Sequence, residues 1–133
     1  LPNGYVELEY IEASNESQYI TTNILPDWTT EIDAKFRTGN NKTFTVLSRW
    51  TNSPAADTFG VIVSSTSSNI VSYFGRYSDG LYQNDVNLRL NANQDVEYKL
   101  GESSVQINTR TYSITRQNLG FENTLPLWIF KLF

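Results

Sequence analysis

The chain has 133 residues, enough for one domain built around a single hydrophobic core. It contains no cysteine and no histidine, which excludes disulfides, thiolate sites and every Ser-His-Asp arrangement, and removes the commonest metal ligand and general base. Its formal net charge is -4 with ten scattered basic residues, which argues against a nucleic-acid partner because neutralising phosphates needs clustered cations.

The predicted elements are all extended. Residues 1–10 alternate apolar and acidic side chains, and Leu8, Tyr10 and Ile20 are expected to point inward from a first strand and the one that follows it. Alternation is strict in residues 30–37, which predicts one buried and one hydrated face. Turn signals containing Gly, Pro, Asn or Asp separate the other predicted strands, at residues 19–24, 43–50, 58–64, 70–77, 81–90, 96–100, 104–108, 111–115 and 125–133.

Helical periodicity is not sustained for even three turns anywhere in the sequence, and aromatic residues make up 14% of it. Both features favour an all-β antiparallel sandwich or barrel. The strand at residues 43–50 carries large groups on both faces, so we expect it in the middle of a sheet. We expect residues 1–133 to form one domain excised from a larger protein, because the chain begins without Met or a signal peptide. No apolar run approaches the roughly 20 residues of a membrane span.

Two carboxylates, Glu31 and Asp33, lie on one face of a predicted strand, about 7 Å apart by the strand repeat. Glycosidases need such a pair of acids. However, Lys35 and Arg37 follow on the same face, and we expect these cations to pair with the two acids and lower their pKa, which is the wrong direction for a general acid. The glycines never have phosphate-loop spacing. No catalytic residue is therefore predicted.

Aromatic residues beside arginines suggest a binding site for sugars. A sugar presents an apolar C–H face and a fringe of hydroxyls, which suits flat aromatic rings next to polar groups that bind in pairs. For the aromatic residues on strands, core packing is favoured over ligand contact. Trp28 lies in a predicted loop, where a binding platform and packing are equally good explanations. Arg49 and Arg76 interrupt apolar strands, so each needs a carboxylate or a ligand. The candidate binding residues are Trp28, Arg49, Trp50, Tyr73, Arg76, Tyr77 and Tyr82.

No cofactor or metal site is predicted. The loop residues Asp57, Asp79 and Asp85 have the oxygen ligands that calcium prefers, but no spacing among them matches a defined calcium-binding loop.

The opening of the chain resembles a known module. LPNGYVELEYIEA at residues 1–13, followed by QYITT at 18–22, is similar to the start of concanavalin A-like, laminin-G-like jelly-roll domains of bacterial surface proteins and of phage tail and baseplate proteins. The resemblance implies two curved antiparallel sheets that bind glycans on the concave sheet or its rim loops. Laminarinase-type glucanases of this fold carry alternating Glu, Asp and Glu. Lys35 replaces the third acid here, so the resemblance implies a non-catalytic domain.

Such domains usually continue with further strands beyond the one that resembles residues 125–133. We therefore expect either a trimmed domain or another segment that supplies the missing edge, since an apolar strand left at an edge invites pairing with another chain.

The leading hypothesis is a non-catalytic module that binds cell-surface polysaccharide. It would act in a virion tail or baseplate, or on a bacterial surface, within a multimeric parent assembly and without membrane insertion. The alternative is a structural or protein-interaction domain of such an assembly, without glycan binding. A glycosidase, degenerate or active, is the third hypothesis.

Overall fold

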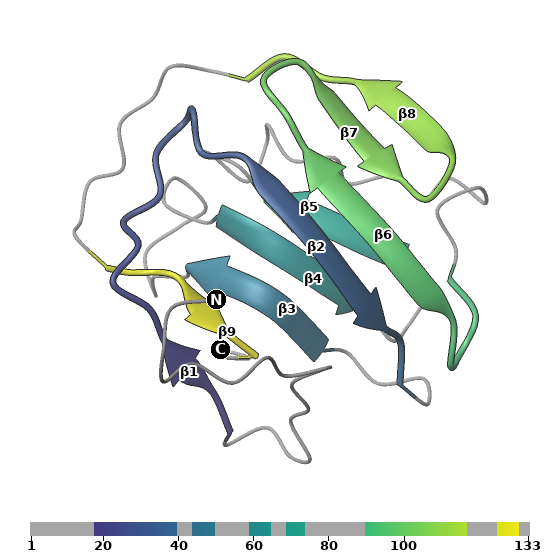
Figure 1. Ribbon diagram of the computed structural model, residues 1–133, viewed down its shortest axis with the longest axis horizontal. Coiled ribbons are helices and arrows are strands. Elements are labelled where there is room, and N and C mark those ends of the chain that lie inside the picture. Colours follow the sequence, from purple (N-terminus) through teal and green to yellow (C-terminus); the bar gives the residue numbers. More distant parts are fainter. Residues whose placement is uncertain are drawn as a thin grey trace, which may run out of the picture.

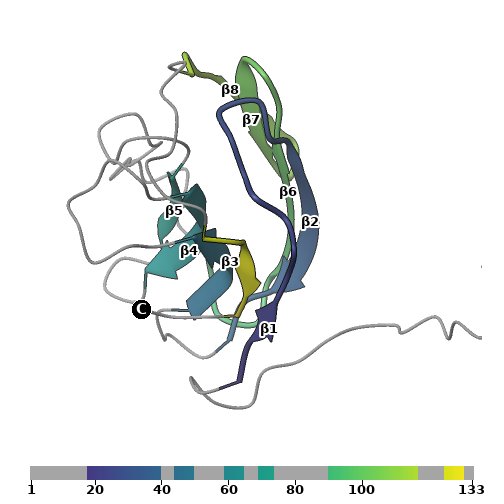
Figure 2. The same cartoon turned by 90° about the vertical axis from the view of Figure 1, so that its left-hand side faces the viewer.

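The computed structural model describes residues 18–39, 44–49, 59–64, 69–73, 90–116 and 125–130. Every regular element in these segments is a β-strand. The strands form two antiparallel sheets that face each other as two layers (Figures 1 and 2). The predicted all-β, antiparallel architecture is thus confirmed for the described part of the chain.

One sheet has five strands and the other has four. The five-stranded sheet has, in spatial order, β1 (Ile20–Thr21), β9 (Trp128–Ile129), β3 (Phe44–Arg49), β4 (Phe59–Ser64) and β5 (Asn69–Tyr73). The four-stranded sheet has β2 (Ile32–Arg37), β6 (Asp95–Leu100), β7 (Ser104–Ile107) and β8 (Arg110–Ser113). As expected from its sequence, β3 lies inside its sheet, between β9 and β4.

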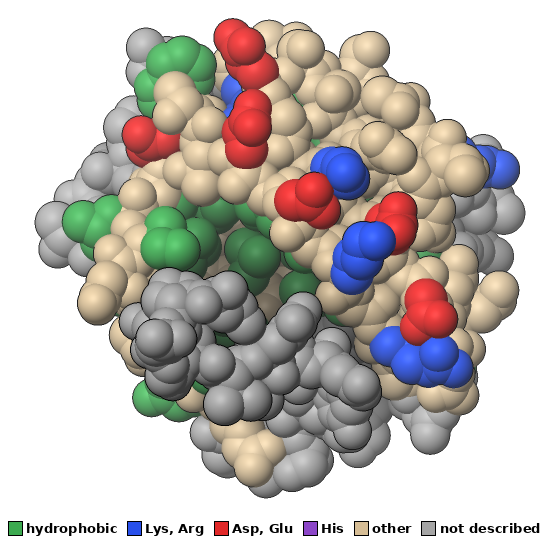
Figure 3. All heavy atoms as spheres, in the orientation of Figure 1, with side chains coloured by type: hydrophobic (Ala, Val, Ile, Leu, Met, Phe, Trp, Pro, Cys, Tyr) green, Lys and Arg blue, Asp and Glu red, His purple; other side chains and the backbone are tan. Residues whose placement is uncertain are grey.

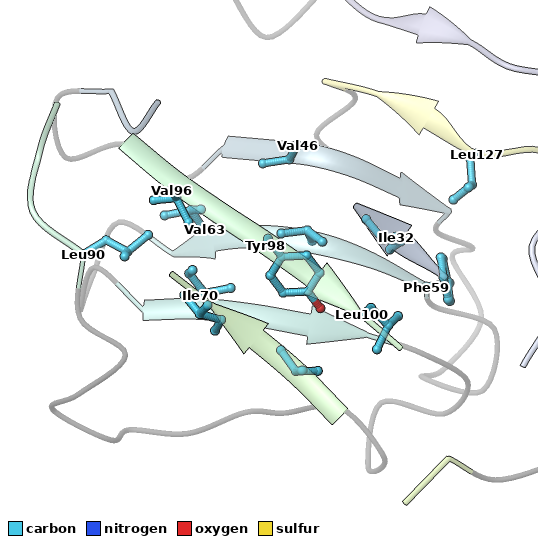
Figure 4. Packing of buried hydrophobic residues seen from close by; sticks show 13 residues of the cluster. Ile32, Val46, Phe59, Val63, Ile70, Leu90, Val96, Tyr98, Leu100 and Leu127 are labelled. Carbon is cyan, nitrogen blue, oxygen red and sulfur yellow. The ribbon is translucent and has the colours of Figure 1, made fainter. Parts of the chain in front are cut away.

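Alternation along the strands builds the core between the sheets. In β6, every second residue is buried and the residues between them are exposed. Tyr98 of β6 is opposite Ala34 of β2 and, on its other side, Ile107 of β7, so these strands present one continuous apolar face. The buried cluster draws on both sheets (Figure 4) and comprises Ile32, Val46, Phe59, Val61, Val63, Ile70, Leu90, Val96, Tyr98, Leu100, Val105, Ile107 and Leu127.

Most predicted strands match observed ones to within two residues. β2, β3, β4, β6, β7 and β8 fall within the strands predicted at residues 30–37, 43–50, 58–64, 96–100, 104–108 and 111–115, give or take one residue at one end. β5 is described only to Tyr73. The first strand near Leu8 lies outside the described residues, as does the strand predicted at 81–90 except for Leu90, which is buried.

The alternation predicted for β3 fails at one point. The register against β4 shifts between Thr45 and Leu47, so Val46 joins the buried cluster while Leu47 also packs against it. Such a bulge adds one residue to one strand and resets which face the following residues take. As a result Arg49 lies opposite Phe59, on the side of the sheet that faces the core.

The other face of the five-stranded sheet is also closely packed. Thr45 and Ser48 are each 1% exposed, and Ser48 is opposite Gly60 in β4. A Cβ atom built on Gly60 would overlap the carbonyl oxygen of Leu47 and would lie 2.8 Å from the Cα of Ser48. The absence of a side chain at residue 60 therefore allows β3 and β4 to approach at this pair.

The C-terminal segment corrects two expectations. Residues 125–133 are predicted as one buried strand, but β9 has only two residues, and it pairs with β1 on one side and β3 on the other. Of residues 125–130, only Leu127 is buried. Phe130 ends the strand with a φ of 65°, a left-handed conformation that a bulky residue rarely adopts. The edge strand here is β1, where Ile20, expected to point inward, is 42% exposed.

Candidate functional site

A hydrogen-bonded turn presents Trp28 just before β2. The Oδ1 atom of Asp27 accepts hydrogen bonds from the amide and hydroxyl of Thr29, at 2.8 and 2.7 Å, and from the hydroxyl of Thr30 at 3.1 Å. In return, the amide of Asp27 donates to Thr30 Oγ1 at 2.8 Å. Asp and Thr side chains commonly fix turns in this way. The Trp28 side chain at the tip is half-buried, so the turn holds an indole partly in solvent.

The same hydrogen bonds act on the charge of Asp27. The hydroxyl of Thr29, and then its amide, hold the pKa of the Asp27 carboxyl below its ordinary value, because donors stabilise the ionised form. The carboxylate is therefore ionised throughout the neutral pH range, and all three of these bonds use the same oxygen, Oδ1.

Three segments converge at the end of the four-stranded sheet where β2 begins. The pairing of Ile32 with Leu100 places Glu31 beside the turn between β6 and β7. After β8, the amide of Ile114 donates to the carbonyl of Ser103 in that turn at 2.9 Å. The chain therefore carries residues 114–116 to the same end as the Trp28 turn, as the upper left of Figure 1 shows.

Arg116 is the last residue of the third segment. Its Nε, Nη1 and Nη2 atoms are enclosed by protein, and this burial lowers the pKa of the guanidinium, while the negative charges of Asp27 and Glu31 raise it. Arg116 is thus electrostatically coupled to the carboxylate next to Trp28. We call Asp27, Trp28, Glu31 and Arg116 the Trp28 site.

The Trp28 site combines an aromatic ring, carboxylates, a guanidinium and the threonine hydroxyls of the turn. Asp27 and Glu31 are exposed, as is Glu102 in the β6–β7 turn. Figure 3 shows acidic side chains gathered over the start of β2 and this turn, at the top of the view. Among the described residues, no group of three or more acidic side chains is arranged to hold a metal ion. The site can stack an apolar ring face and exchange hydrogen bonds with hydroxyl groups.

The outer face of the four-stranded sheet differs from the sequence-based expectation. Lys35 pairs with Glu97 at 2.6 Å, instead of with the acids of its own strand, and Lys99 pairs with Asp33 at 3.2 Å. These partners are directly opposite each other across β2 and β6, where side chains of paired strands meet. Arg37 pairs in the same way with Asp95 at 2.9 Å, and the three ion pairs run diagonally across the front of the molecule (Figure 3).

Ion pairing shifts the pKa values of the closest pair in opposite directions. Glu97 raises the pKa of Lys35, and Lys35 lowers the pKa of Glu97, because each charge stabilises the other. All six side chains of this face are at least half exposed, so each pair contributes little to stability.

The predicted site residues are distributed as follows. Trp28 lies at the site described above. Arg49 is 1% exposed within β3, and its side chain belongs to the enclosed side of the five-stranded sheet. Tyr73 ends β5, with its side chain outside the described part of the structure. Trp50, Arg76, Tyr77 and Tyr82 lie outside the described residues, as do Asp57, Asp79 and Asp85.

Sequence reasoning did not select Arg116 or assign Glu31 to binding. A signal for Arg116 existed, because it is the only charged residue between positions 111 and 121. The argument applied to Arg49 and Arg76, that a cation among uncharged residues needs a partner or a ligand, holds for it equally. Its coupling to Asp27 depends on contacts between segments far apart in sequence, which no local pattern encodes.

No protein-family model, curated protein or solved structure matches the chain. In the described segments, no helix is long and apolar enough to cross a membrane. What the Trp28 site can bind therefore follows from its own residues.

Proposed function

We propose that this chain is a non-catalytic carbohydrate-binding module of the concanavalin A-like, jelly-roll kind, and that it holds saccharide at the Trp28 site. The observation that carries the proposal is the partly exposed indole of Trp28, which is carried by a turn that the bonds between Asp27 and its two threonines fix. Because the turn is fixed before binding, its backbone loses little conformational freedom when a ligand stacks on the ring.

The residues of the site match both the apolar face and the hydroxyl groups of a sugar ring. The C–H face of a pyranose ring is apolar and packs against an indole. Its hydroxyl groups can donate hydrogen bonds, so they suit the exposed carboxylates of Asp27 and Glu31 as acceptors.

A binding role without catalysis is supported by the strand that carries the acids. A glycosidase needs a carboxyl group whose pKa is raised so that it can donate a proton. Asp33 is ion-paired with Lys99 at 3.2 Å. The position at which the resemblance places a third acid is Lys35, which is itself paired with Glu97. The strand therefore has a paired lysine where a catalytic member of the fold would have a carboxyl group.

We further propose that the ligand is a host cell-wall polysaccharide, recognised from a virion tail or baseplate or from a bacterial surface. This setting is supported by the resemblance of residues 1–13 and 18–22 to such modules. Single-site affinity would be weak, and a multimeric parent would compensate by avidity. Trp50, Tyr73, Arg76, Tyr77 and Tyr82 stay predictions for further contacts with the same chain of sugars.

Glycan-array screening followed by isothermal titration calorimetry tests the proposal. We expect Trp28→Ala to lower the affinity for the bound saccharide at least about tenfold, and Trp28→Phe to retain part of it. Trp128→Phe is the matched control, because Trp128 is likewise half-buried but lies in β9, and it should leave binding unchanged. A folded wild-type protein that binds no saccharide would contradict the proposal.

One observation favours the second candidate, a protein-interaction domain. Four large apolar side chains are exposed in one uncharged stretch around β1: Tyr19 at 50%, Ile20 at 42%, Ile24 at 56% and Leu25 at 59%. An edge strand can pair with a strand of another chain, and exposed apolar side chains favour such an interface. Analytical ultracentrifugation should then detect self-association that Ile24→Lys abolishes. A wild-type protein that stays monomeric at every concentration argues against pairing between copies.

A further inference from the structure

The charges around the Trp28 site restrict which saccharides it can hold. Resting on the carbohydrate-binding function proposed above, we infer that the site selects uncharged saccharides and rejects uronic acids and other acidic sugars. The inference follows from the balance of charge at the site and from where the other cations of the described chain lie.

Carboxylates outnumber cations at this end of the sheet. Asp27 and Glu31 are both exposed, and the β6–β7 turn, which is bonded to residue 114, adds the exposed Glu102. Among the residues that the structure describes, Arg116 is the cation at this end of the sheet, and the nitrogens of its side chain are enclosed by protein. A sugar carboxylate that stacked on Trp28 would therefore approach several like charges in exchange for one cation.

The remaining cations of the described residues are not placed to receive an acidic sugar at Trp28. Lys35, Arg37 and Lys99 each have an acidic partner on the outer face of the sheet. Arg49 is enclosed within β3 of the other sheet. Arg110 lies opposite Ile107 at the β7–β8 turn, at the far end of the hairpin from residues 114–116.

The same arrangement favours a neutral ring. Carboxylates are acceptors only, and each oxygen can receive a sugar hydroxyl. Asp27 uses Oδ1 for the three bonds within the turn, and the low pKa of its carboxyl keeps it an acceptor at neutral pH. A neutral pyranose supplies the hydroxyl donors that these acceptors need, without adding a charge.

Matched oligosaccharides test the inference by calorimetry. The probes are neutral gluco-, manno- and galacto-oligosaccharides beside the oligouronates of the same linkage. Oligogalacturonates with and without methyl esters are included, because esterification removes the charge and adds only one methyl group for each carboxyl. We expect the neutral member of a bound pair to bind at least about tenfold more tightly, with the ratio falling as salt rises.

Two variants with the same change in net charge separate a local effect from a global one. Glu31→Gln should reduce the preference for the neutral member at least about threefold, because it removes a charge at the site. Glu97→Gln removes a charge from the ion pair with Lys35 and should leave the preference unchanged. Thermal melting confirms that both variants are folded.

The outcomes distinguish this inference from the function on which it rests. If no saccharide binds, the proposed function fails. If an acidic saccharide binds as tightly as its neutral counterpart or more tightly, carbohydrate binding stands and the inference fails. If both variants alter the preference equally, the overall charge of the protein sets it, and the assignment to the Trp28 site is wrong.

Discussion

Thr38 offers a sharp test of how the four-stranded sheet is held in register. It directly follows β2 and is 4% exposed. Its Oγ1 donates to the carbonyl of Asn91 at 2.6 Å and accepts from the amide of Gln94 at 2.8 Å. Both partners belong to the turn that leads into β6. Thr38→Val replaces the hydroxyl by a methyl group of similar volume, so it removes both bonds without opening a cavity.

The expected cost follows from those two bonds. At about 1 kcal/mol for each, the free energy of unfolding should fall by about 2 kcal/mol. That corresponds to a fall in Tm of roughly 6 to 10 °C for a chain of this size. The backbone bond from Thr38 N–H to the Gln94 carbonyl, at 2.9 Å, is retained, so the fold should persist.

Urea denaturation followed by circular dichroism measures this cost. The midpoint should move down by about 1 M with an unchanged slope. Thr38→Ser keeps the hydroxyl and loses only a methyl group, so it should cost clearly less. Equal destabilisation by the two variants, or a stable Thr38→Val protein, would show that the hydroxyl does not organise this turn.

Three further predictions concern stability. Gly60→Ala should cost about 2 to 3 kcal/mol in urea titrations, because its Cβ would overlap backbone atoms of β3, whereas Gly39→Ala, with open space at its Cβ, should be nearly neutral. Asn108 has a φ of 54°, and its Oδ1 accepts a hydrogen bond from the amide of Glu97 at 2.9 Å. Asn108→Ala should lower the free energy of unfolding by about 1 to 2 kcal/mol in the same titration. Asn108→Gly should lower it less, because glycine tolerates a positive φ. Because Lys35 lowers the pKa of Glu97, the stabilisation from this pair is complete above the ordinary glutamate pKa of about 4.3 and is lost as pH falls through the lower, folded-state pKa. Between pH 5 and about 3, Tm should fall more steeply in the wild type than in Glu97→Gln, and parallel curves would contradict the assignment.

The sequence predicted strands correctly where one face of the strand packs on the core and the other face is exposed to solvent. β2 shows this most clearly, because Ile32, Ala34 and Phe36 alternate with charged residues, and the register confirms that the apolar set faces Tyr98 and its neighbours. Side chains on a strand alternate by geometry, so the pattern needs no knowledge of the partner strand. The turn carrying Trp28 was similarly visible, from Pro26 and Asp27.

The site was only partly readable for the complementary reason. Trp28 stands out in a loop, but Arg116 lies 88 positions further along the chain and reaches this end of the sheet through the bond between Ile114 and Ser103. The ion pairs show the same limit. The charged residues nearest to Lys35 on its own strand face are Asp33 and Arg37, but its partner Glu97 comes from β6. Pairing between strands depends on register, which residues within one strand do not specify.

The sequence by itself determined that the described part of this protein is all-β, that the charged residues of β2 lie on its outer face, and that the chain lacks the side chains of histidine and thiol chemistry. Composition and two-residue periodicity are local properties, so they can be read without the fold. Tertiary structure alone decided that β9 lies between β1 and β3, that a bulge turns Arg49 toward the core side, and that Arg116 is brought into electrostatic range of Asp27. Each of these depends on which strands become neighbours, and that choice is made by burying the apolar faces of the whole chain together.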